Sequence, residues 1–210
     1  MRPYKLNIKL IVASVGIFSL IVFSLTLLIF HIAKMGSVMD ILLEYAYIIA
    51  PTSLLWVLTD KYLWHTRLFQ SIRRPLNIPP DIRGRWEGTL ENADGSEAQK
   101  FVIEVKETLT TLTVHTFTSI GHSASILSEI ASSEHEDKFT LCYLWQGELN
   151  TSMKDIHQRE IFHGYTMLHL HEHESPKMFR GSYFTNRPSS QTRGGIQLTW
   201  VSHTLKRKLE

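Results

Sequence analysis

The sequence predicts a membrane-anchored all-β protein, in which a pair of N-terminal membrane-spanning helices carries an eight-stranded antiparallel β-barrel. Two long apolar runs near the N-terminus predict the helices, and a period-two alternation after Pro80 predicts the strands. Charge divides the chain at the same place. The net charge of +2 combines +5 over residues 1–74 with −3 over residues 75–210.

The first apolar run, residues 10–30, holds twenty-one residues without a charge. A helix needs about twenty apolar residues to cross the hydrocarbon core of a bilayer. A cleaved signal peptide is the alternative, but its apolar core usually spans about 7–15 residues and ends in a small-residue cleavage site. This run is longer and no such site follows it, so we expect a transmembrane helix.

The second apolar run, residues 41–58, contains Glu44 and Pro51, and Asp40 directly precedes it. Asp40 and Glu44 are four residues apart and would share one face of a helix. Two interpretations remain open. The acids lie at the membrane surface near the helix start, or they form a polar contact inside an oligomer, since ionisable groups in spans are costly and often functional.

The short connection over residues 31–40 makes the two spans a hairpin, so residues 1–74 form the membrane part of the chain. Basic residues flank its outer ends, which places both termini in the cytoplasm by the positive-inside rule. Residues 59–74 continue either as an amphipathic interfacial helix or as a plain extension of the second span. The proline-rich linker 75–81 ends the helical pattern and marks the domain boundary.

Residues 82–210 alternate with a period of two in eight segments separated by turn signals. A meander of eight short strands closes readily into a barrel, which we favour over a two-sheet sandwich. One face of each segment is expected to point inward, in chain order: Trp86, Gly88, Leu90; Phe101, Ile103, Val105; Leu112, Val114; Ile126, Ile130; Phe139, Leu141, Tyr143, Trp145; Phe162, Gly164, Thr166, Leu168, Leu170; Met178, Arg180, Ser182, Phe184; Ile196, Leu198, Trp200.

Arg180 is the most informative of these inward positions, because a buried guanidinium needs a partner. An internal acid such as Glu129 or Glu104 is one candidate, and an anionic ligand with phosphate or carboxylate groups is the other. The hydroxyls of Thr118 and Ser182 interrupt the apolar rows in the same way. We therefore take Arg180, Ser182 and Thr118 as candidate ligand contacts.

Four inward aromatic residues complete the predicted binding site: Trp86, Tyr143, Trp145 and Trp200. Aromatic residues inside a small barrel are core residues by default. As a group they also offer stacking surfaces, and a stacked base contributes about 1–3 kcal/mol.

The sequence contains no arrangement typical of catalysis, so neither enzymatic activity nor a cofactor is expected. Cys142 is the lone cysteine, which excludes a disulfide framework and a thiolate zinc site. His169, His171 and His173 would share one strand face, which is typical of a polar outer wall and less often of a zinc site. The acidic β domain excludes a coat for DNA or RNA polymers.

The layout of the whole chain resembles the two-transmembrane, β-strand-rich effectors associated with bacterial cGAS/DncV-like nucleotidyltransferases. These are the membrane effectors of cyclic-oligonucleotide-based antiphage signalling (CBASS). The likeness is carried by the two spans, the proline-rich junction and the opening PPDIRGRWEGTLEN, together with GSYF at residues 181–184 and LTW at residues 198–200, which are also lipocalin-like.

This resemblance implies a lipocalin-like barrel that binds a cyclic dinucleotide made after phage infection. It further implies that the protein forms homo-oligomers when activated and disrupts the bacterial inner membrane, so that the infected cell dies. The partners would be the cyclic dinucleotide, the lipid bilayer and further copies of the chain. A membrane-anchored carrier of an apolar small ligand is the alternative, and a purely structural subunit with a filled barrel is a third interpretation.

Overall fold

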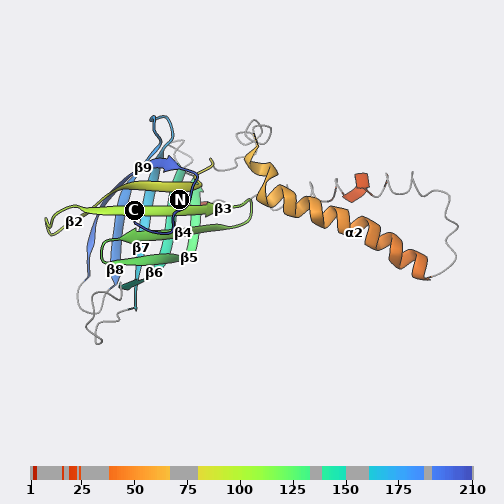
Figure 1. Ribbon diagram of the computed structural model, residues 1–210, viewed down its shortest axis with the longest axis horizontal. Helices are drawn as coiled ribbons and strands as arrows, with labels where there is room; N and C mark the ends of the chain where they lie inside the picture. The colour runs from red at the N-terminus through yellow and green to blue at the C-terminus, as the bar shows by residue number, and fades with distance from the viewer. Residues whose placement is uncertain are drawn as a thin grey trace. The chain divides into compact units, whose positions relative to one another are not determined.

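The protein is described by a computed structural model, whose elements are drawn in Figure 1. Its described residues are 2–3, 16, 19–22, 24, 38–66, 80–132, 139–149, 161–186 and 191–209. The chain divides into two compact units. One holds residues 5–78, and the other joins residues 79–210 with residues 1–4.

The first unit is dominated by helix α2 (Val38–Lys61), which runs through Pro51 without ending. A short 3₁₀ helix, η1 (Leu63–His65), follows, and the backbone is extended at Thr66. Of the helical extension predicted over residues 59–74, residues 59–61 belong to α2 and residues 63–65 to η1, and residues 67–74 lie outside the described ranges. The last turn of α2 gives way to a tight turn in which the Thr66 N–H bonds to the Leu63 carbonyl, at 3.0 Å.

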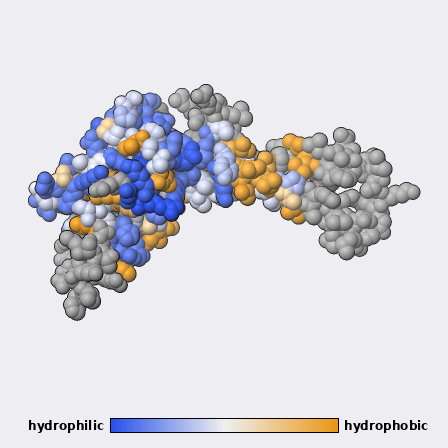
Figure 2. Space-filling view, in the orientation of Figure 1, coloured by the Kyte–Doolittle hydropathy of each residue, from blue (hydrophilic) through white to orange (hydrophobic). Residues whose placement is uncertain are grey.

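Within the described ranges, no helix is both long and apolar enough to cross a bilayer. Most of the predicted first span, residues 10–30, lies outside these ranges, and the second span, residues 41–58, falls inside α2. Asp40 and Glu44 belong to the first two turns of α2. Figure 2 shows apolar residues along the coloured, later part of α2, and the transmembrane hairpin stays a prediction.

The second unit is a closed β-barrel of eight antiparallel strands, as predicted. From β2 to β9, each strand pairs with the next strand in sequence, and β2 closes the ring by pairing with β9. A closed ring leaves no exposed edges along its length. The strands are β2 (Gly84–Asn92), β3 (Gln99–Glu107), β4 (Leu112–Thr118), β5 (Gly121–Ser132), β6 (Phe139–Leu149), β7 (Ile161–His171), β8 (Met178–Asn186) and β9 (Arg193–Ser202). The two-residue strand β1 (Arg2–Pro3) pairs with the end of β5.

Large apolar side chains fill one end of the barrel, where β2 begins. The Trp86 side chain is fully buried and stacks at a tilt on Phe179, with ring centroids 4.3 Å apart. Its indole N–H donates to the Ile82 carbonyl at 2.9 Å, so Ile82 lies over this end. The core around them includes Ile103, Val105, Val114, Leu141, Leu168, Leu170, Ile196 and Leu198. Burial of these side chains supplies the main driving force for closure.

Two strands differ from the predicted inward pattern. In β5 the pairing register shifts between Ser125 and Leu127, and this bulge leaves Ile126 half-exposed instead of inward. In β8 the alternation is the reverse of the predicted one. Phe179, Tyr183 and Thr185 are buried, whereas the side chains between them are exposed.

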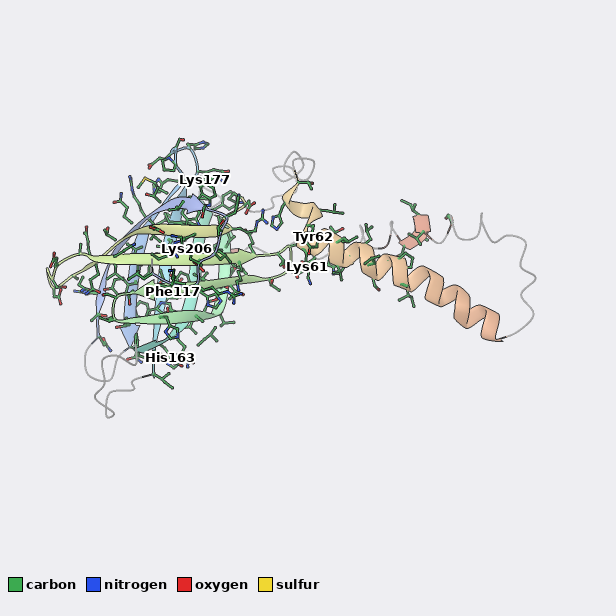
Figure 3. All side chains as sticks on the ribbon, viewed as in Figure 1. Lys61, Tyr62, Phe117, His163, Lys177 and Lys206 are labelled. Atoms are coloured by element: carbon green, nitrogen blue, oxygen red, sulfur yellow. The ribbon has the colours of Figure 1, made fainter. Side chains whose placement is uncertain are left out.

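The C-terminal segment crosses the outer wall of the barrel beside β2 and β3, where Figure 3 labels Lys206. Arg85 and Glu104 hold it there, although both point outward from the sheet and both are buried. Arg85 contacts Glu104 at 2.9 Å and donates to the carbonyls of Lys208 and Leu209. Glu104 accepts hydrogen bonds from the backbone N–H groups of residues 206 and 207. Backbone groups of the C-terminal segment therefore form hydrogen bonds with both members of this buried ion pair.

Candidate binding pocket

The barrel opens at its other end, where β2, β4, β6 and β8 finish, and there it contains a pocket of about 200 Å³. Its described lining comes from the seven strands β2 to β8, from the turn between β4 and β5, and from Thr192, which directly precedes β9. Aromatic residues line its inner part, and hydroxyl and amide side chains follow them toward the rim. The lining consists of Leu90, Asn92, Gln99, Phe101, Thr116, Thr118, Ile120, Gly121, His122, Ser123, Tyr143, Trp145, Glu148, Phe162, Thr166, Tyr183, Thr185 and Thr192.

Most polar groups of the rim are already hydrogen-bonded. The hydroxyls of Thr185 and Thr192 lie 2.7 Å apart, and the Thr118 hydroxyl donates to the Gly121 carbonyl at 3.0 Å. The Tyr183 hydroxyl donates to the side-chain carbonyl of Asn92. These bonds hold the rim in a defined shape before any ligand arrives.

The Tyr143 hydroxyl differs from these groups. It is fully buried and has no hydrogen-bond partner among the described residues. Burial disfavours the charged phenolate and raises the pKa of Tyr143 to about 12, against the opposing effect of the hydroxyls of Thr166 and Thr116. At neutral pH the group is therefore an uncharged donor and acceptor.

The position of Trp145 depends on two glycines. A Cβ atom at Gly164 would lie 2.2 Å from Cζ2 of the Trp145 ring, and one at Gly147 would lie 2.9 Å from the Phe162 ring. The indole N–H of Trp145 donates to the Thr166 hydroxyl at 2.9 Å. The absence of side chains at these glycines thus lets the indole lie against the barrel wall and leaves the pocket open.

The structure brings together three of the seven predicted ligand contacts. Tyr143, Trp145 and Thr118 line the pocket. Trp86 packs in the filled end of the barrel. Trp200 is half-buried, and its indole N–H donates to the Arg83 carbonyl at 3.1 Å. The structure therefore places both of these tryptophans in the framework of the barrel, away from the pocket.

The inward orientation predicted for Arg180 and Ser182 is wrong, because both lie on the exposed face of β8. The Arg180 guanidinium lies 3.5 Å from Glu174, so neither suggested internal acid is its partner. Glu104 pairs with Arg85 instead, and Glu129 is exposed on β5. Phe184, which suggested the inward register, packs on Tyr165 outside the barrel, with ring centroids 5.7 Å apart.

Several pocket residues were not among the predicted ligand contacts, although the sequence carried a signal for some of them. Phe101, Phe162 and Thr166 lie on faces that were expected to point inward, so the alternation alone could have nominated them. Tyr183 and Thr185 were missed because the register of β8 was reversed. Asn92, Gln99, His122 and Glu148 belong to strand ends, which period-two patterns do not assign.

The histidine row is broken in the structure. His169 and His171 alternate with buried leucines on β7 and face outward as predicted, but β7 ends at His171, so His173 lies in the following turn. His169 is hydrogen-bonded to Thr140 at 3.0 Å, and His171 lies 3.7 Å from Glu174. Across the described ranges, no group of three or more His, Cys, Asp or Glu residues is arranged to hold a metal ion.

The pocket contains little charge. Its described lining includes Glu148 and His122, which pair across β5 and β6, and neither lysine nor arginine. Neutral hydroxyl and amide groups therefore provide the polar contacts available to a ligand inside the barrel.

Comparison with known proteins agrees with a barrel that has a ligand pocket at one end. No curated protein matches the chain. Residues 77–200 match the family model described as the Cap15 cyclic dinucleotide receptor domain, which covers more than half of the chain and the barrel almost completely. The chain therefore belongs to the Cap15 family of cyclic dinucleotide receptor domains, which are sensors of CBASS signalling.

Proposed function

We propose that the open-end pocket of this barrel binds a cyclic dinucleotide and that binding activates the protein as an antiphage effector. One observation carries the proposal. A chain of the Cap15 receptor family has a preformed pocket of about 200 Å³ at one end of a barrel whose other end is filled by Trp86 and Phe179. Ligand sites of β-barrels lie preferentially in such mouths.

The pocket lining supports a nucleotide over a purely apolar cargo. Phe101, Trp145 and Phe162 offer aromatic surface for a base. Behind them lies the buried Tyr143 hydroxyl, which has no described partner and which an apolar cargo would leave unpaired at a cost in free energy. This composition favours the receptor over the lipocalin-like carrier.

We further propose that the N-terminal 74 residues convert binding into damage to the bacterial inner membrane. The support comes from the sequence: two apolar runs, a short connection and basic outer flanks. In this arrangement both termini and the barrel are cytoplasmic, and activated copies associate as homo-oligomers. Asp40 and Glu44, early in α2, then lie at the membrane surface or at a contact between copies.

Binding is tested by calorimetry on the full-length protein in detergent micelles, with a panel of cyclic dinucleotides that differ in bases and linkage. We expect at least one member to bind with a one-to-one stoichiometry per barrel, and linear dinucleotides to bind more weakly. If no member of the panel binds, the receptor function is wrong.

The membrane step is tested separately in cells. Expression of the full chain together with the nucleotidyltransferase that makes the ligand is expected to stop growth and to admit a membrane-impermeant dye. Removal of residues 1–74 is expected to abolish both effects. If the truncated protein still kills, the membrane mechanism is wrong even if the barrel binds ligand.

A further inference from the structure

The inner part of the pocket contains a polar group that no described residue satisfies. Tyr143 is 1% exposed, lines the pocket, and its hydroxyl has no hydrogen-bond partner among the described residues. Buried hydroxyls in native proteins are nearly always hydrogen-bonded, because an unpaired one costs free energy. Such a group inside a binding pocket points to a ligand atom that pairs with it.

Two further hydroxyls lie beside this one. Thr116 and Thr166 are both buried and both line the pocket. The Thr166 oxygen accepts the indole N–H of Trp145 at 2.9 Å, which leaves its own O–H able to donate. Tyr143, Thr116 and Thr166, which we call the hydroxyl triad, therefore offer both donors and acceptors in one small space.

The charge of the described lining disfavours a phosphate at this position. A phosphodiester buried beside the hydroxyl triad would lose its hydration without a compensating cation, because the described lining includes neither lysine nor arginine. Glu148, nearer the rim, adds a negative charge. An uncharged polar group suits the inner part of the pocket, and the phosphates suit the wetter rim.

The aromatic part of the lining leads to the same arrangement. A single planar base is the part that matches an aromatic wall formed by Phe101, Trp145 and Phe162.

We propose that one nucleobase of the ligand enters the barrel and forms hydrogen bonds through its polar edge to Tyr143, Thr116 and Thr166, while the phosphates remain at the rim. This inference rests on the proposed function, since it takes the ligand to be a cyclic dinucleotide. It makes the hydroxyl triad the determinant of base selectivity.

The test compares the full-length protein with Tyr143→Phe, which removes one oxygen and keeps the ring. Using the panel member that binds the wild type most tightly, we expect Tyr143→Phe to weaken binding by roughly 10- to 100-fold. The melting temperature of the ligand-free protein should rise, because an unpaired buried hydroxyl has been removed. The same pattern of weaker binding is expected for Thr116→Val.

Tyr165→Phe is the matched control, because Tyr165 lies outside the barrel against Phe184. Its ligand affinity should equal that of the wild type.

The possible outcomes separate the two proposals. If the wild type binds no cyclic dinucleotide, the proposed function fails, and this inference fails with it. If the wild type binds but Tyr143→Phe binds equally well, the receptor function stands and the insertion of a base is wrong.

Discussion

The two ends of the barrel use the same strands for different purposes. At the filled end, Trp86 packs on Phe179, and its indole N–H is satisfied by the Ile82 carbonyl. At the open end, Trp145 lies against two glycines, and the Tyr143 hydroxyl has no described partner. The packed core of the filled end thus supplies the stability that offsets the cost of the unpaired Tyr143 hydroxyl at the open end.

The largest expected effect comes from the filled end. Trp86→Ala removes a fully buried ring and leaves a cavity, so the free energy of unfolding should fall by about 3–5 kcal/mol. Urea denaturation followed by circular dichroism measures this change. Trp200→Ala should cost clearly less, because Trp200 is only half-buried. Equal losses would contradict the deeper burial of Trp86.

A smaller effect on stability, but a large one on binding, is expected at the open end. In Gly164→Ala the new methyl group would overlap the Trp145 ring and crowd the Phe184 carbonyl oxygen, so the ring must move from its place in the pocket wall. We expect a stability loss of about 1–3 kcal/mol and at least a tenfold loss of ligand affinity, measured by denaturation and calorimetry.

Gly195→Ala is the control for this substitution, because nothing lies within 4 Å of a Cβ atom at that position. It should leave both quantities unchanged. Unchanged ligand affinity in Gly164→Ala would show that the pocket does not depend on the position of Trp145.

A third prediction concerns alkaline pH. The pKa of Tyr143 is raised from 10 to about 12, so the folded state favours the neutral phenol. This contribution is complete below pH 10 and is lost as the pH rises through 12. Relative to Tyr143→Phe, the wild type should lose up to about 2 kcal/mol of stability over that interval. Parallel pH profiles for the two proteins would contradict the burial of this hydroxyl.

The smallest effect is expected outside the barrel. Arg180 is exposed and contacts Glu174 at 3.5 Å, so Arg180→Ala should change stability by less than about 0.5 kcal/mol. Ligand affinity should also stay the same, which calorimetry can check. A loss of binding comparable to that in Tyr143→Phe would restore Arg180 as a ligand contact.

The sequence was sufficient to predict the barrel but not all of its faces. Period-two alternation and short turns predicted eight strands and their closure, because one face of each strand must be apolar to fill the interior. In β8 both faces carry aromatic residues, and Gly181 interrupts the face that points inward. The alternation therefore predicted the opposite face as the inward one. The bulge at Ile126 adds one residue to β5, which no alternation can reveal.

The candidate site was predictable only in part for a related reason. Tyr143 and Trp145 lie on a strongly alternating strand, so their inward orientation followed from the sequence. Which end of the barrel is open depends on how Ile82 and Trp86 fill the other end. The support given to the C-terminal segment by Arg85 and Glu104 is also hidden from the sequence, since it acts through backbone groups.

The central claim is that ligand binds at the open end of the barrel, and the tryptophan indole signals test it most directly. In a nitrogen-15 NMR spectrum of the full-length protein, saturating cyclic dinucleotide is expected to shift the indole signal of Trp145, which lies in the pocket. The signal of Trp86, in the filled end, should stay in place. A ligand that binds but leaves the Trp145 signal unmoved, or shifts that of Trp86 instead, would contradict the assignment of the site.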